Sequence, residues 1–223
     1  MLKVYPDIVQ GTEAWFAARL GMPTASEFSA VMAEGKGAMR ETYMNRLAGE
    51  RLTGKVSSNY TNAAMERGKE MEDEARRNYA FTFDVELEAG TFMTNGPGEV
   101  IDAWGYSPDS LKIGRPGLVE IKTTEPHLLA AMSKAQDKDA KWFPPQHKAQ
   151  CQGGLLVSER DHIDLVIYWP DMPMLLFTAY RDVAYIRRLE EELYLFNKEL
   201  DALEATLRAK RAAQGYVERQ AAA

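Results

Sequence analysis

The segment that most constrains the fold is GLVEIKTT, residues 117–124, because it places two charged side chains inside an apolar run typical of a buried strand. Residues two apart share one face of a strand, so Glu120 and Lys122 are expected to point the same way. Asp109 lies upstream in a Ser-Pro-Asp turn, where the proline biases the residue before it towards an extended backbone. A hairpin from Asp109 to Glu120 would therefore bring two carboxylates together.

Two converging carboxylates offer the hard oxygen ligands that Mg²⁺ prefers. A divalent metal can activate water and stabilise charge on a scissile phosphate. Lys122 could orient that water or neutralise the developing charge. The pattern thus predicts metal-dependent phosphodiester hydrolysis. The spacing by itself occurs by chance in many chains, and it also fits an ordinary cross-strand pair of Glu120 and Lys122 on a solvated face.

The rest of the chain predicts a mixed α/β fold, a central sheet flanked by helices with a long C-terminal helix. Strands broken by Gly, Pro and Asn are expected to form a meander at 85–95, 100–108 and 117–124, with two more strands at 162–170 and 174–180. Helices are expected at 23–32, 39–54, 62–81, 125–135, 146–158 and from 182 to about 213.

Two of these helices carry informative stripes. In the helix 62–81, Glu72 falls on the inner stripe, where an unpaired charge would be costly to bury. It lies either at a partly exposed edge of that stripe or in a site that needs a carboxylate. In the last helix, apolar residues from Ile186 to Leu207 recur at alternating steps of three and four. That helix either lies across its own domain or also meets another subunit.

The segment 15–28 has groups suited to an anion. Arg19 offers a planar fork that matches a phosphate, and Thr24 and Ser26 stand at a helix start, where hydroxyl and free N–H groups favour negative charge. The same residues fit plain helix capping and a surface ion pair. Neither interpretation is excluded by the residues alone.

Length and composition suit one domain with a real core: the chain has 223 residues, 45% of them apolar. We expect N-terminal helices in 1–60, the core in 61–180 and the C-terminal helix in 181–223. The single cysteine, Cys151, excludes an internal disulfide and fits a reducing compartment. We find neither a signal peptide nor an apolar run of about 20 residues, so we expect a cytoplasmic protein with no membrane partner. A net charge of −6 argues against a protein that simply coats DNA.

Five sequence blocks occur in the order of a known family: QGTEAWFAARLGMPTASEF, RGKEMEDEAR, YSPDSL, LVEIKTT and HKAQCQGGLLV. With them the chain resembles the restriction-endonuclease-like PD-(D/E)XK nuclease fold. Within that fold it resembles the phage lambda exonuclease family, also called the YqaJ-like viral recombinase family. The resemblance covers about residues 10–156. The family often has Gly after Ser-Pro-Asp, where this chain has Ser110.

The resemblance implies a role for each residue of the acidic constellation. Two Mg²⁺ ions per site are implied, with Mn²⁺ as a possible substitute. The implied metal ligands are Asp109, Glu120, the backbone carbonyl of Ile121 and, for the second ion, Glu72. Lys122 would be the catalytic lysine, and Gln150 would lie beside the site.

The resemblance also implies a pocket for a terminal 5′-phosphate, formed by Arg19 and Ser26 with Thr24 and Ser107. Trp15 would pack near it, and Lys36 would reach a phosphate. The residues leave open whether Lys112 and Arg115, between Asp109 and Glu120, contact DNA.

The implied activity is that of a processive 5′→3′ exonuclease on double-stranded DNA ends, which releases 5′-mononucleotides and leaves 3′ overhangs. The implied assembly is a ring-shaped homotrimer that works with a single-strand annealing protein, encoded by a phage or prophage. Two alternatives remain: an endonuclease of the same fold, and a non-catalytic module that grips DNA ends.

Overall fold

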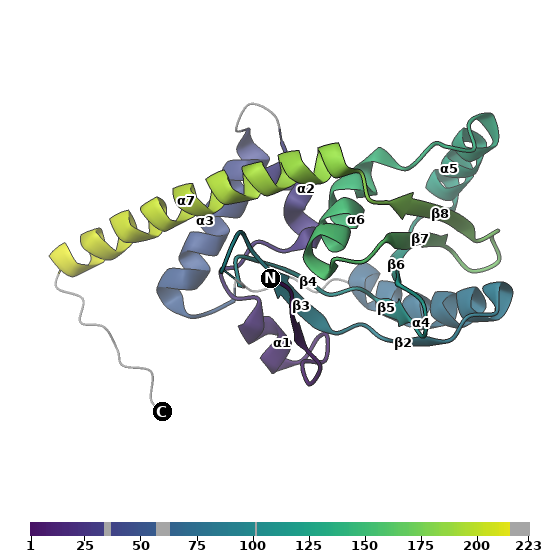
Figure 1. Cartoon of the computed structure of the whole chain (residues 1–223), viewed down its shortest axis with the longest axis horizontal. Coiled ribbons are helices and arrows are strands. Elements are labelled where there is room, and N and C mark those ends of the chain that lie inside the picture. The colour runs from purple at the N-terminus through teal and green to yellow at the C-terminus, as the bar shows by residue number, and fades with distance from the viewer. Residues whose placement is uncertain (34–36, 57–62, 101, 215–223) are drawn as a thin grey trace.

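The structure is a computed structural model that describes residues 1–33, 37–56, 63–100 and 102–214, with the backbone alone for 63–70. Its layers are arranged around two sheets, with the long C-terminal helix α7 (Val183–Ala213) extending along one side (Figure 1). The mixed α/β fold with a long C-terminal helix, predicted from the sequence, is confirmed. No helix in the described part of the chain is long and apolar enough to cross a membrane.

The larger sheet has five strands in the order β2-β5-β6-β7-β8. Strands β6 and β7 run parallel, and all other neighbours in this sheet are antiparallel. The strands are β2 (Leu87–Ala89), β5 (Ser110–Lys112), β6 (Gly117–Thr123), β7 (His162–Tyr168) and β8 (Leu175–Tyr180). The segment that carries Glu120 is thus the central strand, which explains its apolar flanks.

A smaller sheet has the order β1-β3-β4, with β1 (Lys3–Tyr5), β3 (Phe92–Asn95) and β4 (Trp104–Tyr106). The predicted three-strand meander is therefore wrong, because 85–95 splits into β2 and β3, which join different sheets. The split lies at Gly90, where a Cβ atom would stand 1.6 Å from the carbonyl oxygen of Pro108. Only glycine allows the two backbone segments to pass so closely.

The helices follow the expected segments, and α1 is the one that the sequence analysis did not predict. They are α1 (Glu13–Ala18), the 3₁₀ turn η1 (Ala25–Glu27), α2 (Phe28–Val31), α3 (Ala38–Thr53), α4 (Ala63–Phe83), α5 (Pro126–Lys138) and α6 (Pro145–Ser158). Helix α4 covers one face of the five-stranded sheet, where Val119 and Ile121 pack with Ala75 and Tyr79. The main core lies on the other face, towards α6.

Helix α7 lies against α3 (Figure 1). Its first five stripe residues are buried: Ile186, Leu189, Leu193, Phe196 and Leu200. Ion pairs Arg40–Glu199 at 2.6 Å and Arg51–Asp201 at 2.7 Å join the same two helices. The helix therefore lies across its own domain, as one of the two interpretations predicted. A second-subunit contact through its partly buried end stays a prediction.

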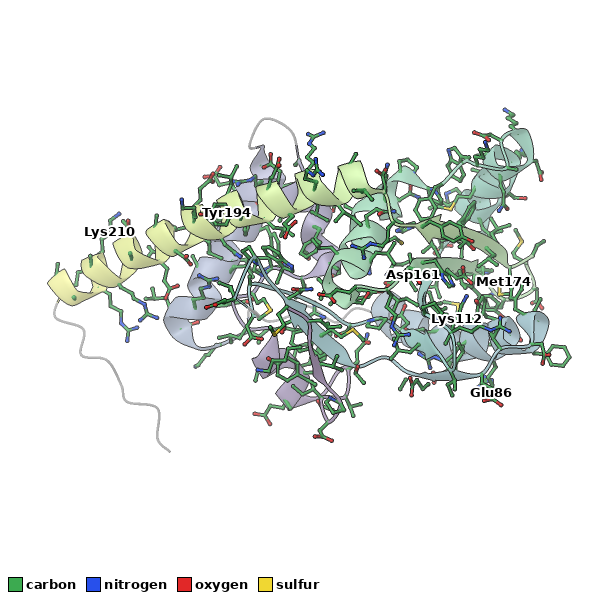
Figure 2. All side chains as sticks on the ribbon, in the orientation of Figure 1. Glu86, Lys112, Asp161, Met174, Tyr194 and Lys210 are labelled. Atoms are coloured by element: carbon green, nitrogen blue, oxygen red, sulfur yellow. The ribbon has the colours of Figure 1, made fainter. Side chains whose placement is uncertain are left out.

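A buried polar network ties β5, β7, β8 and α4 together. The Nζ atom of Lys112 donates to Oδ2 of Asp164 at 2.6 Å, and Tyr79 donates to the same oxygen. Thr178 donates to the other oxygen at 2.6 Å. Burial acts to raise the pKa of Asp164, but these hydrogen bonds outweigh it and hold that pKa below its usual value. Lys112, labelled in Figure 2, is thus a structural residue with its side chain inside the protein.

We expect Lys112→Met to lower the free energy of unfolding by about 3 kcal/mol, because it leaves a buried carboxylate without its cation. Chemical denaturation followed by circular dichroism would measure the change. Lys3→Met is the matched control, since Lys3 pairs with Asp102 at the exposed surface and its loss should change little. Equal effects of the two substitutions would contradict a structural role for the network.

Candidate active site

Asp109 and Glu120 meet where β5 and β6 form a hairpin, with Ser110 opposite Val119. The Oδ2 atom of Asp109 accepts a hydrogen bond from the N–H of Ile121 at 2.6 Å. The N–H and carbonyl of one strand residue point to the same side, so the Ile121 carbonyl faces the side on which Asp109 lies. The structure thus brings together the three groups that the sequence analysis placed around a metal.

The Glu120 carboxylate lies at the centre of the site and is 2% exposed, which excludes the solvated-face interpretation. Its Oε1 accepts from Lys122 Nζ at 2.7 Å and from the amide of Gln150 on α6. Its Oε2 accepts from the hydroxyl of Tyr106 at 2.8 Å. Three donors from three elements therefore hold this one side chain.

Negative charge is in excess at this point. Burial and the charge of Glu120 raise the pKa of Asp109 well above its usual range. Burial alone would lower the pKa of Lys122, but the two carboxylates raise it above its usual value. Two buried carboxylates and a carbonyl oxygen, with one ammonium group beside them, form a set of oxygen ligands that fits a divalent cation of the Mg²⁺ type.

Glu72 lies near this pair without joining it. Burial raises its pKa, and the charge of Glu120 adds to the effect. Its Oε1 accepts from Arg76 at 2.9 Å on the same helix. Among the residues the structure describes, no three side chains of Asp, Glu, His or Cys are close enough to hold one ion. A metal-binding role for Glu72 therefore stays a prediction.

Sequence reasoning missed Arg76 and Tyr106. Arg76 Nε donates to the hydroxyl of Ser110 at 2.9 Å, and another guanidinium nitrogen donates to the Asp109 carbonyl at 3.3 Å. Ser110, in the place where the family often has glycine, also donates to that carbonyl at 2.7 Å. The signal for Arg76 was its position four residues after Glu72. No sequence feature indicated a site role for Tyr106, apart from its position just before the Ser-Pro-Asp turn.

The predicted anion-binding residues line a separate cavity of about 270 Å³, which Trp15, Arg19, Thr24 and Ser26 share. The Arg19 guanidinium stacks on the Trp15 ring at 4.0 Å and donates to the Thr24 hydroxyl at 3.0 Å and the Ser26 hydroxyl at 3.5 Å. The Trp15 indole donates to Ser107 at 2.8 Å. The five residues thus form one connected group. Lys36 lies outside the described residues.

Arg19 is a half-buried cation that forms no ion pair among the residues that the structure describes. Burial lowers the pKa of its guanidinium. None of the ion pairs found in the described part of the chain involves Arg19. Its hydrogen-bond partners are neutral hydroxyl groups, and the carboxylates of Glu27 and Glu50 act on its charge without an ion pair to it in the described part of the chain. A half-buried guanidinium of this kind suits a bound phosphate.

The two sites are joined through β4 and the turn that follows it. Tyr106 contacts Glu120, Ser107 contacts Trp15, and Asp109 comes two residues later. At the other end, Gly105 donates to the Pro23 carbonyl at 2.9 Å and forms a parallel bridge with Thr24. A Cβ atom on Gly105 would lie 2.8 Å from the Phe92 ring, so glycine is needed for this approach.

A family model matches most of the chain. The model of the YqaJ-like viral recombinase domain matches residues 14–161. The chain belongs to the YqaJ-like viral recombinase family. The matched range contains every predicted site residue, from Trp15 to Gln150. No curated protein matches the chain.

Solved structures extend the family comparison over most of the chain. The alkaline exonuclease LHK-Exo of Laribacter hongkongensis is 33% identical, with 91% of this chain and 100% of that chain covered and a TM-score of 0.79. Its complex with dAMP gives the same identity and coverage and a TM-score of 0.76. A phage-related exonuclease of Haemophilus somnus has the same fold at 15% identity, with 83% and 96% covered and a TM-score of 0.63.

Proposed function

We propose that this member of the YqaJ-like family is a nuclease that acts on DNA, and more closely a 5′→3′ exonuclease on double-stranded ends. It would release 5′-mononucleotides and leave 3′ overhangs. Family membership and the alkaline exonuclease neighbours support the nuclease. The observation that carries the finer proposal is the connection between the Arg19 cavity and the Glu120 carboxylate through residues 105–109.

In this proposal Asp109, Glu120 and the Ile121 carbonyl hold Mg²⁺ or Mn²⁺, and Glu72 assists with a second ion. When bound, the metal would activate water and stabilise charge on the scissile phosphate. Lys122 holds a positive charge beside Glu120 that can meet the charge developing on the phosphate. Gln150 fixes the Glu120 carboxylate and faces the same space.

End recognition follows from the second cavity. Arg19, with the hydroxyl groups of Thr24, Ser26 and Ser107 around it, would bind the terminal 5′-phosphate. Trp15 stacks on the Arg19 guanidinium and fixes its plane. A terminal phosphate held next to the carboxylates places the first phosphodiester bond in the reactive position. Repetition of this step would shorten one strand from its 5′ end and leave the other as an overhang.

The proposal extends to the wider setting that the resemblance implies. The chain would act as one nuclease domain, 1–223, in a ring-shaped homotrimer around the DNA. It would supply single strands to an annealing protein in the cytoplasm of a bacterium that carries the phage or prophage. Contacts to the phosphate backbone would make its binding sensitive to salt and blind to sequence.

A gel assay with linear duplex DNA labelled at its 5′ or 3′ end, incubated with Mg²⁺ or with EDTA, tests the activity. We expect the 5′ label to be released first as a mononucleotide, only with metal, and a covalently closed circle to remain intact. Cutting of the circle would indicate the endonuclease of the same fold. Binding of ends without any cleavage would indicate the non-catalytic module.

A further inference from the structure

A second guanidinium group, that of Arg46 on α3, lines the same cavity as Arg19. Arg46 also lines a neighbouring cavity of about 340 Å³ and lies over the Tyr43 ring at 4.9 Å. Burial lowers the pKa of Arg19; the charge of Arg46 acts in the same direction, and the carboxylates of Glu27 and Glu50 act against it. Two cations therefore face one cavity closely enough to repel each other.

The contact of Arg46 with Glu27 uses only part of the hydrogen-bonding capacity of its guanidinium group. One terminal nitrogen donates to Oε1 of Glu27 at 3.1 Å. The Nε atom is buried and has no hydrogen-bond partner among the described atoms. The two side chains are 37% and 41% exposed, so water weakens their attraction. The Glu27–Arg46 ion pair is thus weak enough for another anion to replace Glu27. The Nε–H group of Arg46 can donate to that anion as well.

The charge of the proposed ligand matches this arrangement. A terminal 5′-phosphate carries nearly two negative charges near pH 7, whereas a phosphodiester carries one. Arg19 supplies a single positive charge. The other carboxylate that lines the cavity, Glu50, accepts from the Gly21 N–H at 3.1 Å and so has a structural contact of its own. A dianion therefore needs a second cation, and Arg46 is placed to supply it.

We propose that Arg46 binds the terminal 5′-phosphate together with Arg19, and that Glu27 competes with this phosphate for Arg46. The inference rests on the proposed function of the Arg19 cavity and adds the residue pair that sets its selectivity. At a 5′-hydroxyl end, Arg46 keeps Glu27 as its partner. At a 5′-phosphorylated end, Arg46 turns to the phosphate, and the half-exposed Glu27 side chain is left to water.

The test compares kcat/KM for release of the first nucleotide from two duplexes that differ only in a 5′-phosphate or a 5′-hydroxyl group, because each later cut starts from the 5′-phosphate that the previous cut leaves. Arg46→Ala is expected to lower kcat/KM at phosphorylated ends by about tenfold to a hundredfold, the range for losing a charge-assisted contact. It should change kcat/KM at hydroxyl ends by less than about twofold. Glu27→Gln should act in the opposite direction and raise the phosphate-to-hydroxyl ratio by about two- to fivefold.

Arg208→Ala is the matched control, because it removes an arginine from an exposed ion pair with Glu204 on α7. It should leave the ratio unchanged. Binding is measured separately by thermal unfolding with and without inorganic phosphate. Phosphate should raise the Tm of the wild type and of Glu27→Gln, and it should raise that of Arg46→Ala much less.

An unchanged phosphate-to-hydroxyl ratio in a folded Arg46→Ala protein would overturn the inference. If that variant does not fold, Glu27→Gln decides, and a ratio that stays the same or falls overturns the inference. The proposed function fails in a different way. If the wild-type protein shows no preference for phosphorylated ends, the proposed 5′-phosphate pocket itself is rejected. A preference that disappears in Arg19→Ala but survives in Arg46→Ala rejects only the role of Arg46.

Discussion

Lys122→Ala is expected to lower the rate of DNA cleavage by about 10²- to 10⁴-fold, the range for losing a positioned charge or proton-transfer group. The ammonium group lies 2.7 Å from Glu120 and is the cation that the described contacts place on this carboxylate. Initial rates on linear duplex with Mg²⁺ in excess would measure the effect. KM should change much less than kcat, because the Arg19 cavity that binds the end is left intact.

The fold should survive this substitution. Glu120 keeps the hydroxyl of Tyr106 and the amide of Gln150 as donors, and Lys122 has a partly exposed side chain. Circular dichroism and thermal unfolding would establish that the variant is folded. Lys3→Ala, which removes an exposed lysine far along the chain from the site, controls for the loss of one charge. A well-folded Lys122→Ala protein with normal cleavage would reject Lys122 as a catalytic residue.

Arg19→Ala is expected to remove the preference for 5′-phosphorylated ends, with a fall in the phosphate-to-hydroxyl rate ratio of about tenfold to a hundredfold. The reason is that the half-buried guanidinium of Arg19 makes hydrogen bonds to neutral hydroxyl groups and stacks on the Trp15 ring, which leaves it able to bind a phosphate. Rates of release of the first nucleotide from paired substrates, one phosphorylated and one not, give the ratio directly.

Arg19→Lys separates charge from shape in the same assay. The ammonium group keeps the positive charge but loses the planar fork and the stacking on Trp15, so we expect only part of the preference to return. Thermal unfolding of both variants would control for the lost stacking. If the phosphate-to-hydroxyl rate ratio is the same in the wild type and in folded Arg19→Ala, Arg19 does not bind the terminal phosphate.

Periodicity predicted most elements of the fold because it is a local property of the chain. The helices at 39–54, 62–81 and 146–158 appear within a few residues of their predicted bounds as α3, α4 and α6. The meander was wrong because strand pairing depends on contacts between distant residues. At Gly90 the decisive partner is Pro108, eighteen positions away, and no local pattern shows it.

The candidate site divides in the same way. The two-residue repeat of a strand placed Glu120 and Lys122 on one face. The family resemblance, carried by the five sequence blocks, implied the roles of Arg19 and Gln150. Tyr106 could not be found from the sequence, since a tyrosine before a turn is a common feature, and for Arg76 the spacing of four residues from Glu72 pointed to an ion pair but not to the Asp109 turn. Their importance lies in what they touch, Glu120 and the Asp109 turn.

By itself, the sequence determined the family, the positions of most helices and strands, and the short list of side chains that can hold a metal or a phosphate. These depend on residue type and on spacing along the chain. Only the tertiary structure decided that Lys112 is buried on Asp164, that Arg76 contacts the Asp109 turn, and that the Arg19 cavity is joined to Glu120 through one turn. The physical reason is that burial and pairing are settled between segments far apart in the chain, where the cost of an unpaired buried charge selects the partner.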